Sequence, residues 1–303
     1  EDQWQILNNV QKLSKQIVCS FGETSISTNQ EKEFKKIEFP LNNIEMILED
    51  SIYIPTMNLS KSLINQLKSF ASFENPQIKI LLSLRKPLFN TPKYIKSFDE
   101  NEEYLILPRG LKEKIVEFFN LKGVQFSFID KRNFKEIQTK KVTFNLRPEQ
   151  NDAIKEIKKT DFSICVAPPG FGKTLLGAKI FEIRACSTLI VVNKNMLLNQ
   201  WIERFVDYFG YTKKDIGYLG KGHNKLNGSI DVGTMQSLKN DPDIINNYSF
   251  VIIDECHHIP AITFEQIVKN FKGKYLLGLS ATPNRKDELQ PILYQQLGDI
   301  SYE

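Results

Sequence analysis

The feature that most constrains the fold of this chain is a short apolar run that leads directly into a loop rich in glycine and proline. Residues 164–174 read Ile-Cys-Val-Ala-Pro-Pro-Gly-Phe-Gly-Lys-Thr, and helix-forming residues follow at 175–180. This order of strand, loop and helix is typical of a phosphate-binding loop, in which glycines let backbone N–H groups turn toward phosphate oxygens. The positive end of the helix dipole lies at the same place. The stretch therefore predicts a nucleotide site at the end of a buried strand.

Several residues of this loop have an expected role in binding ATP with Mg²⁺. Lys173 would reach the β- and γ-phosphates as a point charge, and the Thr174 hydroxyl would be a ligand of Mg²⁺. The usual pattern begins with glycine where this chain has Ala167. The variant fits, because the glycine that the turn requires is the one before the lysine. We expect the nucleotide to be bound by Pro169, Gly170, Gly172, Lys173 and Thr174.

Length, composition and charge limit the classes of protein to which this chain can belong. A chain of 303 residues predicts two domains, and 41% hydrophobic and 25% charged residues are ordinary values for a globular protein. No apolar run approaches the length of a membrane span, and the first residues lack the features of a secretory signal. The net charge of +4 is compatible with nucleic acid as a partner but does not predict one by itself.

The cysteines indicate the cellular compartment of the protein, and the first residue indicates whether the chain is a fragment or has been processed. Cys19, Cys165, Cys186 and Cys256 are scattered, so we expect a reduced, cytoplasmic protein. A zinc site at residues 256–258 is disfavoured, because adjacent residues at a strand end point in different directions and no second ligand pair has a suitable spacing. The chain does not begin with Met, and we expect a fragment or a processed chain.

The hydrophobic pattern divides the chain into three parts. Residues 1–40 are polar, with a predicted amphipathic helix from Gln3 to Val18 followed by a loop. Residues 41–140 predict a small α+β accessory domain, which is a candidate for DNA binding. Residues 141–303 are the predicted ATP-binding domain. Within the accessory domain we expect strands at 44–48, 51–54, 104–107 and 124–129, and helices that begin near Asn58 and after Pro108.

Aromatic and basic side chains of the accessory domain could serve either the fold or a nucleic acid. We expect four aromatic residues in the core rather than as platforms for bases: Phe70, Phe73, Phe89 and Tyr94. Five basic residues could contact phosphates, although ordinary surface charge is the expected role of each: Arg85, Lys86, Lys93, Lys96 and Arg109.

After residue 141, apolar runs alternate with helical segments. The runs lie at 164–166, 188–192, 229–232, 250–253 and 275–279. Continuous apolar strands joined by helices predict an α/β fold whose mostly parallel sheet is covered by helices on both faces. Polar residues gather just after the carboxyl ends of these strands, where ligands bind in such sheets.

The acidic pair Asp254-Glu255 ends the fourth of these runs. We expect Asp254 to hold Mg²⁺, directly or through water, and Glu255 to orient the attacking water. Together with Lys173 these are the predicted catalytic residues. A strand that ends in two acids is unremarkable alone, but its combination with the phosphate-binding loop favours phosphoryl-transfer chemistry.

Three segments together resemble motifs I, II and III of superfamily-two helicases and translocases. They are residues 167–174, Asp254-Glu255-Cys256-His257, and Ser280-Ala281-Thr282. Their flanks at 256–261 and 278–287, and the segment Leu146-Arg147-Pro148-Glu149-Gln150, are similar to the branch that contains XPB, UvsW and the type III restriction translocases. Residues 107–111, Leu-Pro-Arg-Gly-Leu, are similar to a segment that precedes the motor in some viral and mobile-element helicases.

The resemblance implies a RecA-like fold and further roles for particular residues. It implies that Arg147 and Gln150 contact adenine. It implies that His257, Ser280 and Thr282 couple the nucleotide state to nucleic-acid contact. It also implies that a set of residues lies along the nucleic-acid backbone: Lys194, Gly233, Thr234 and Gln236. The chain departs from the family at Asn193-Lys194, where the family often has Pro-Thr.

The resemblance also implies a second RecA-like motor domain, C-terminal to residue 303, that supplies an arginine finger. No Gln-x-x-Arg-x-x-Arg segment follows Ser-Ala-Thr in this chain. Since a missing arginine finger costs about 10³–10⁵-fold in rate, we expect little or no hydrolysis from this chain alone.

The expected function is therefore that of an ATP-dependent helicase or translocase, which acts more on double-stranded DNA than on RNA. Two alternatives stay open. One is a nucleic-acid-binding module that nucleotide switches without unwinding, and the other is a different P-loop enzyme, such as a small-molecule kinase.

Overall fold

The computed structural model describes residues 43–303, apart from 58, 142–144, 259–260, 283–284 and 286. The helix and loop predicted within residues 1–40 lie outside the described residues. The described residues belong to one compact unit, Phe39–Glu303, which contains two main β-sheets. None of the helices in the described ranges is long and apolar enough to cross a membrane. The division of the chain near residues 40 and 140 stays a prediction.

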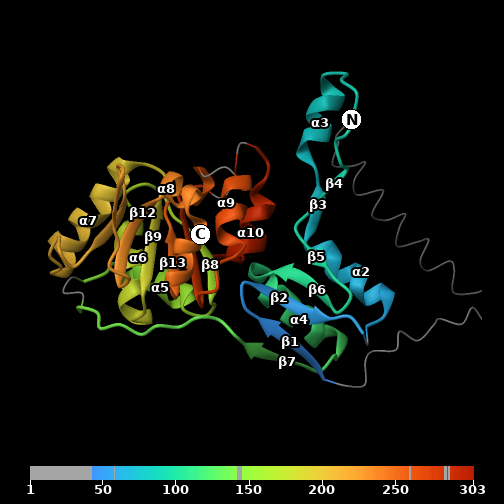
Figure 1. Ribbon diagram of the computed structural model, residues 1–303, viewed down its shortest axis with the longest axis horizontal. Helices are drawn as coiled ribbons and strands as arrows, with labels where there is room; N and C mark the ends of the chain where they lie inside the picture. The colour runs from blue at the N-terminus through green and yellow to red at the C-terminus, as the bar shows by residue number, and fades with distance from the viewer. Residues whose placement is uncertain (1–42, 58, 142–144, 259–260, 283–284, 286) are drawn as a thin grey trace, which may run out of the picture. The chain divides into compact units, whose positions relative to one another are not determined.

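The second half of the chain forms a sheet of eight strands, here called the large sheet (Figure 1). Across the sheet the strands are β11 (His223–Lys225), β10 (Gly217–Gly220), β12 (Ile230–Thr234), β9 (Thr188–Val192), β13 (Phe250–Ile253), β14 (Tyr275–Ser280), β8 (Phe162–Val166) and β15 (Ile300–Tyr302). All neighbours are parallel except β10 and β11. The five predicted strands are confirmed, whereas β10, β11 and β15 are short, contain polar residues or glycine, and were not predicted.

Helices cover both faces of the large sheet. They are α5 (Pro148–Ile157), α6 (Lys173–Arg184), α7 (Asn195–Phe209), α8 (Met235–Asn240), α9 (Ala261–Val268) and α10 (Gln290–Leu297), with 3₁₀ turns η2 (Pro242–Asn247) and η3 (Cys256–His258). Alternate residues of a strand point to opposite faces. Along β9, Leu189 and Val191 join an apolar cluster with α8, α9 and α10, whereas Ile190 and Val192 join one with α5, α6 and α7. The predicted fold class is confirmed.

The first half contains a sheet of five strands, here called the small sheet. Its order is β5 (Asp99–Glu100), β6 (Tyr104–Pro108), β2 (Ser51–Pro55), β1 (Ile44–Leu48) and β7 (Phe126–Asp130). Helices α2 (Lys61–Phe70) and α4 (Lys112–Lys122) and the 3₁₀ turn η1 (Arg109–Leu111) accompany it. The four strands predicted in this region are confirmed. The buried residues of the small sheet belong to the same apolar cluster as α9 and α10, so the two sheets share a continuous core.

Residues 72–97 form a projection from the small sheet, here called the arm (Figure 1). It consists of β3 (Ser72–Glu74), α3 (Pro76–Ser83) and β4 (Tyr94–Lys96), with β3 and β4 paired antiparallel. The prediction that its aromatic residues are core was wrong for two of them, because Phe89 is 89% exposed and Tyr94 is 45% exposed. Both residues lie in the arm, whose one short helix and two short strands leave them open to solvent.

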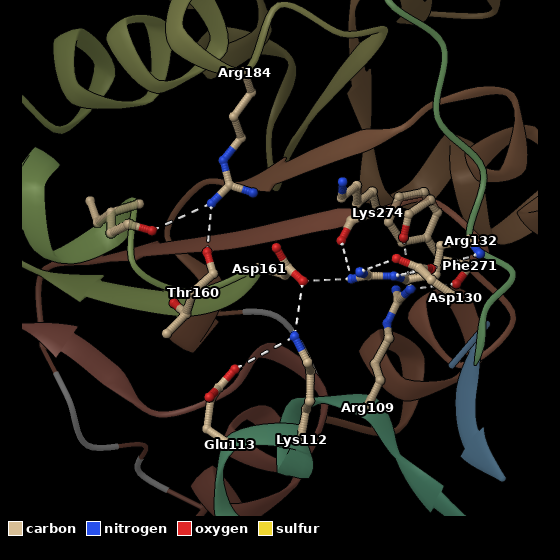
Figure 2. Close-up of polar contacts among 12 residues, drawn as sticks. Arg109, Lys112, Glu113, Asp130, Arg132, Thr160, Asp161, Arg184, Phe271 and Lys274 are labelled. Atoms are coloured by element: carbon tan, nitrogen blue, oxygen red, sulfur yellow. Dashed lines mark hydrogen bonds and ion pairs between the residues drawn. The ribbon is translucent and has the colours of Figure 1, made fainter. Parts of the chain in front are cut away.

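Arg109 was predicted to carry ordinary surface charge, and this prediction was wrong. Its side chain is completely buried between the two sheets (Figure 2). The Nη1 group donates to the carbonyl oxygens of Phe271 (2.6 Å) and Gly273 (3.1 Å), and the guanidinium lies over the rings of Phe162 and Phe271. Burial, reinforced by the charge of Arg132, lowers the pKa of Arg109 to about 9. The side chain thus joins the small sheet to the loop before β14.

A second group of charges joins the sheets beside Arg109 (Figure 2). Arg132 donates through Nη1 to Asp161 Oδ2 (2.9 Å), and Lys112 Nζ lies 3.1 Å from the same oxygen. Burial alone would raise the pKa of Asp161, but the two cations outweigh it and hold that pKa below its usual value. Asp161 directly precedes β8, the strand that leads into the phosphate-binding loop.

Candidate nucleotide-binding site

The phosphate-binding loop connects β8 to α6, as predicted. Gly170 (φ 81°) and Gly172 (φ 94°) adopt left-handed backbone conformations that favour glycine. A Cβ atom on Gly172 would also lie 2.6 Å from Gln150 Nε2, so the Gln150 side chain would have to shift. Ala167 instead continues the line of β8, and its N–H donates to the Ser280 carbonyl (2.9 Å). The departure from glycine at Ala167 is therefore accommodated without strain.

A cavity of about 440 Å³ lies at the carboxyl ends of β8 and β13. This volume is within the usual range for ligand sites. Its lining includes the predicted loop residues Pro169, Gly170, Gly172, Lys173 and Thr174, the acidic pair Asp254 and Glu255, and Leu175. Four further lining residues come from α7: Leu197, Gln200, Arg204 and Tyr208. Their spacing of three and four residues marks one face of a helix, and this signal could have revealed them in the sequence.

Lys173 lies in the wall of this cavity. Its Nζ donates to the Ala167 carbonyl (3.0 Å) and lies 3.5 Å from Glu255 Oε1, and its side chain is 10% exposed. The ammonium group is thus held inside the loop, between the backbone and the acidic pair. Thr174, the second residue of α6, lines the same cavity.

Asp254 lies at the end of β13 and is buried. Its Oδ2 accepts a hydrogen bond from the Trp201 indole Nε1 (2.7 Å). Burial, the largest cause, and the charge of Glu255 raise the pKa of Asp254, although the Trp201 hydrogen bond and Lys173 act in the opposite direction. The sequence alone does not point to Trp201, because its partner Asp254 is 53 residues away along the chain.

Glu255 has an uncommon backbone and an unsatisfied oxygen. Its φ of 49° lies in the left-handed region, which is strained for a residue other than glycine and is enriched at functional sites. Its buried Oε2 has no hydrogen-bond partner within the described part of the chain and lies 3.5 Å from His257 Nδ1. Because an unsatisfied buried acceptor is costly, this oxygen fits a bound water or ligand.

The three residues predicted to couple nucleotide and nucleic acid lie together. Ser280 Oγ is 2.8 Å from His257 Nδ1, and the Thr282 N–H donates to the same oxygen (3.2 Å). Burial lowers the pKa of His257, aided by the neighbouring His258, although Glu255 acts against this shift. The trio therefore links the ends of β13 and β14 through one serine hydroxyl.

Arg147 and Gln150 both hold the phosphate-binding loop at Phe171. The Phe171 carbonyl accepts from Gln150 Nε2 (2.7 Å) and from Arg147 Nη2 (2.6 Å). Gln150 Oε1 accepts from the Arg147 backbone N–H (2.9 Å). Gln150 is buried and Arg147 is exposed, so only the arginine side chain is open to solvent. Their contact with adenine stays a prediction, beside this bracing of the loop.

The residues predicted to lie along a nucleic acid are in or just after two neighbouring strands, β9 and β12, which pair in register at Val192 and Thr234. Lys194, just before α7, and Gln236, in α8, are exposed. Thr234 is buried and caps α8, since its hydroxyl accepts from the Ser237 N–H (3.3 Å). Gly233 is buried within β12. The role of all four in binding nucleic acid stays a prediction.

Residues 143–285 match the family model described as type III restriction enzyme, res subunit. The chain is 35% identical over 182 residues to the DNA 3'-5' translocase XPB2 of Sulfurisphaera tokodaii, which is 59% of this chain and 39% of that protein. It is 30% identical over 184 residues to the probable helicase D10 of Escherichia phage T5, which is 60% of this chain and 40% of that protein.

The structure is similar to the UvsW helicase of bacteriophage T4, with a TM-score of 0.66 and 21% identity over 86% of this chain and the whole of that chain. At this identity the likeness concerns the fold, and its coverage extends from the large sheet into the small sheet. The chain spans about two fifths of the length of the two curated relatives. The fold of the chain is thus similar to that of a helicase with a RecA-like core, and residues 143–285 match a restriction-enzyme family model, in agreement with the resemblance carried by the three motifs.

Proposed function

We propose that this chain is the ATP-binding half of the motor of an ATP-dependent DNA helicase or translocase, and that Mg²⁺ accompanies the ATP. The observation that carries the proposal is the convergence of Lys173, Asp254 and Glu255 on one cavity, with a carboxylate oxygen of Glu255 left without a hydrogen-bond partner among the described residues. DNA is the proposed nucleic-acid substrate because one relative is called a DNA translocase.

The geometry supports a division of roles in hydrolysis. The triphosphate would lie on the backbone N–H groups of the loop, and Lys173 would exchange its contact with the Ala167 carbonyl for phosphate oxygens. Thr174 and Asp254 would hold Mg²⁺, which neutralises charge on the phosphates. Glu255 would orient the attacking water, because its unpartnered oxygen is available to accept the proton of that water.

Two further parts of the proposal concern recognition and coupling. Arg147 and Gln150 would contact adenine while they brace the loop at Phe171. His257, Ser280 and Thr282 would transmit the state of the nucleotide, because their hydrogen bonds join the acidic pair to the end of β14. Lys194, Gly233, Thr234 and Gln236 would lie along the DNA backbone. A second motor domain, which would supply the arginine finger, completes the proposed enzyme.

The proposal is tested by ATP hydrolysis in a longer version of the protein that includes the second motor domain. We expect double-stranded DNA to stimulate hydrolysis more strongly than RNA, while the 303-residue chain binds nucleotide and hydrolyses it little. Single-stranded DNA and a nucleic-acid-free reaction serve as comparisons. Nucleotide-dependent DNA binding without any stimulated hydrolysis would instead establish the switched binding module, and transfer of phosphate to a small metabolite would establish the kinase alternative.

We infer that the arm contributes to nucleic-acid binding by the proposed accessory domain, residues 41–140. It carries five basic side chains and a single acidic one, Glu74; the basic ones are Lys79, Arg85, Lys86, Lys93 and Lys96. The arm also leaves Phe89 and Tyr94 exposed. Cationic side chains attract phosphates, and exposed aromatic rings stack on unpaired bases.

Substitution of Phe89 with alanine is expected to weaken binding of DNA with unpaired bases by about 1–3 kcal/mol, which is about 5- to 150-fold. Fluorescence anisotropy with labelled forked DNA measures the effect. Leu121→Ala removes another exposed apolar side chain, 79% exposed on α4, and is expected to leave the affinity unchanged. Equal affinity in Phe89→Ala and in the unmutated protein would contradict the role of the arm and would favour a protein partner for it.

A further inference from the structure

Trp201 is wedged between the helix that follows the phosphate-binding loop and the acidic pair. It is 1% exposed. Its ring packs on Gly177 of α6, where an added Cβ atom would lie 2.9 Å from Trp201 Cη2, and it neighbours Phe205. The indole therefore has little freedom to rotate. Its only polar group, the Nε1–H, donates to Asp254 Oδ2 at 2.7 Å.

The partner of this indole is unusual for a group that serves packing alone. A buried tryptophan N–H needs an acceptor, and a backbone carbonyl would suffice. Here the acceptor is the carboxylate at the end of β13, in the wall of the cavity. A hydrogen bond to an ionised acceptor is short and strong, so it fixes the rotation of the carboxylate about its Cβ–Cγ bond.

We propose that Trp201 is a positioning residue, which holds the Asp254 carboxylate in the orientation that a nucleotide-bound divalent cation requires, and that the indole reports on that cation. The inference rests on the proposed function, because it assumes that the cavity binds Mg²⁺ with a nucleotide. It goes beyond that function by assigning to α7 a part in the metal site. Groups that orient a metal ligand in this way typically account for about 10- to 100-fold in metal affinity.

The first test compares nucleotide binding with Mg²⁺ and with EDTA, by calorimetry on the 303-residue chain with a non-hydrolysable ATP analogue. Trp201→Phe keeps an aromatic ring and removes the N–H. We expect the increase in nucleotide affinity that Mg²⁺ causes to be about 10- to 100-fold smaller in this variant, while the affinity in EDTA stays unchanged. Phe205→Leu removes apolar contacts beside the indole, and it is expected to lower stability without changing the Mg²⁺ effect.

The second test keeps Trp201 in place. The chain has two tryptophans, Trp4 and Trp201, so Trp4→Phe leaves a single indole. We expect its emission to change when nucleotide and Mg²⁺ are added together, and not with nucleotide in EDTA. The positioning role would be overturned if Trp201→Phe kept the full effect of Mg²⁺ on nucleotide affinity. It would also be overturned if the emission of Trp201 did not depend on Mg²⁺. Failure of the proposed function is distinct, because the unmutated chain would then bind no nucleotide under either condition.

Discussion

Replacement of Lys173 with alanine is expected to lower nucleic-acid-stimulated ATP hydrolysis by about 10²–10³-fold or more, in the longer version of the protein. The reason is that Lys173 supplies the positive charge inside the loop, where it lies 3.5 Å from Glu255 Oε1 and has a side chain that is 10% exposed. A cation in such a sheltered place acts on phosphate charge with little screening by water. The measurement is the turnover rate at saturating ATP and DNA, together with nucleotide affinity in the 303-residue chain.

The matched control for this prediction is Lys179→Ala. Lys179 lies further along the same helix, α6, and pairs with Glu182 (2.8 Å) away from the cavity. We expect this variant to keep its hydrolysis, since a pair of this kind contributes about 0.2–0.5 kcal/mol to the helix alone. Hydrolysis by Lys173→Ala at the rate of the unmutated protein would show that the loop does not perform the chemistry.

Replacement of Arg109 with alanine is expected to lower the free energy of unfolding by about 3–5 kcal/mol. The change leaves a cavity between the rings of Phe162 and Phe271, and it leaves the carbonyl oxygens of Phe271 and Gly273 without their donor. Urea denaturation followed by circular dichroism measures the loss. Because Arg109 joins the two sheets, we also expect the transition to broaden or to divide into two.

Arg109→Met separates the two contributions. Burial of the guanidinium without a carboxylate partner is unfavourable, which is why the pKa of Arg109 falls to about 9. Methionine fills much of the same volume and removes that cost, so we expect it to lose less stability than alanine. The control is Lys131→Ala, at the exposed residue that precedes Arg132 in the chain. Its free energy of unfolding is expected to lie within about 0.5 kcal/mol of that of the unmutated chain. Equal stability in Arg109→Ala would contradict the importance of this contact.

The position of this contact relates the small sheet to the large sheet. Arg109 binds the loop before β14, and Arg132 binds Asp161 just before β8. The opposite ends of the same two strands carry Ser280 and the phosphate-binding loop. The small sheet is thus attached to the amino ends of the strands whose carboxyl ends form the candidate nucleotide site. The segment Leu-Pro-Arg-Gly-Leu at 107–111 has its structural explanation here.

The sequence by itself determined those features that short-range pattern encodes. Continuous apolar strands alternating with helices were sufficient to predict the parallel sheet, because burial on both faces leaves few polar positions in a strand. The left-handed glycines and the lysine of residues 167–174 were readable for a related reason, since a tight backbone turn admits few residue types. The three motifs were sufficient to predict the similarity to helicases and translocases that the comparisons found.

The tertiary structure decided which groups meet over long separations. Arg109 and Phe271 are 162 residues apart, and Trp201 and Asp254 are 53 residues apart, so no local pattern relates them. The same limit explains why Arg109 was predicted to be exposed and Phe89 to be buried. A basic residue is buried only where carbonyl oxygens and rings from another sheet surround it, and an aromatic residue is buried only where enough chain folds back to cover it.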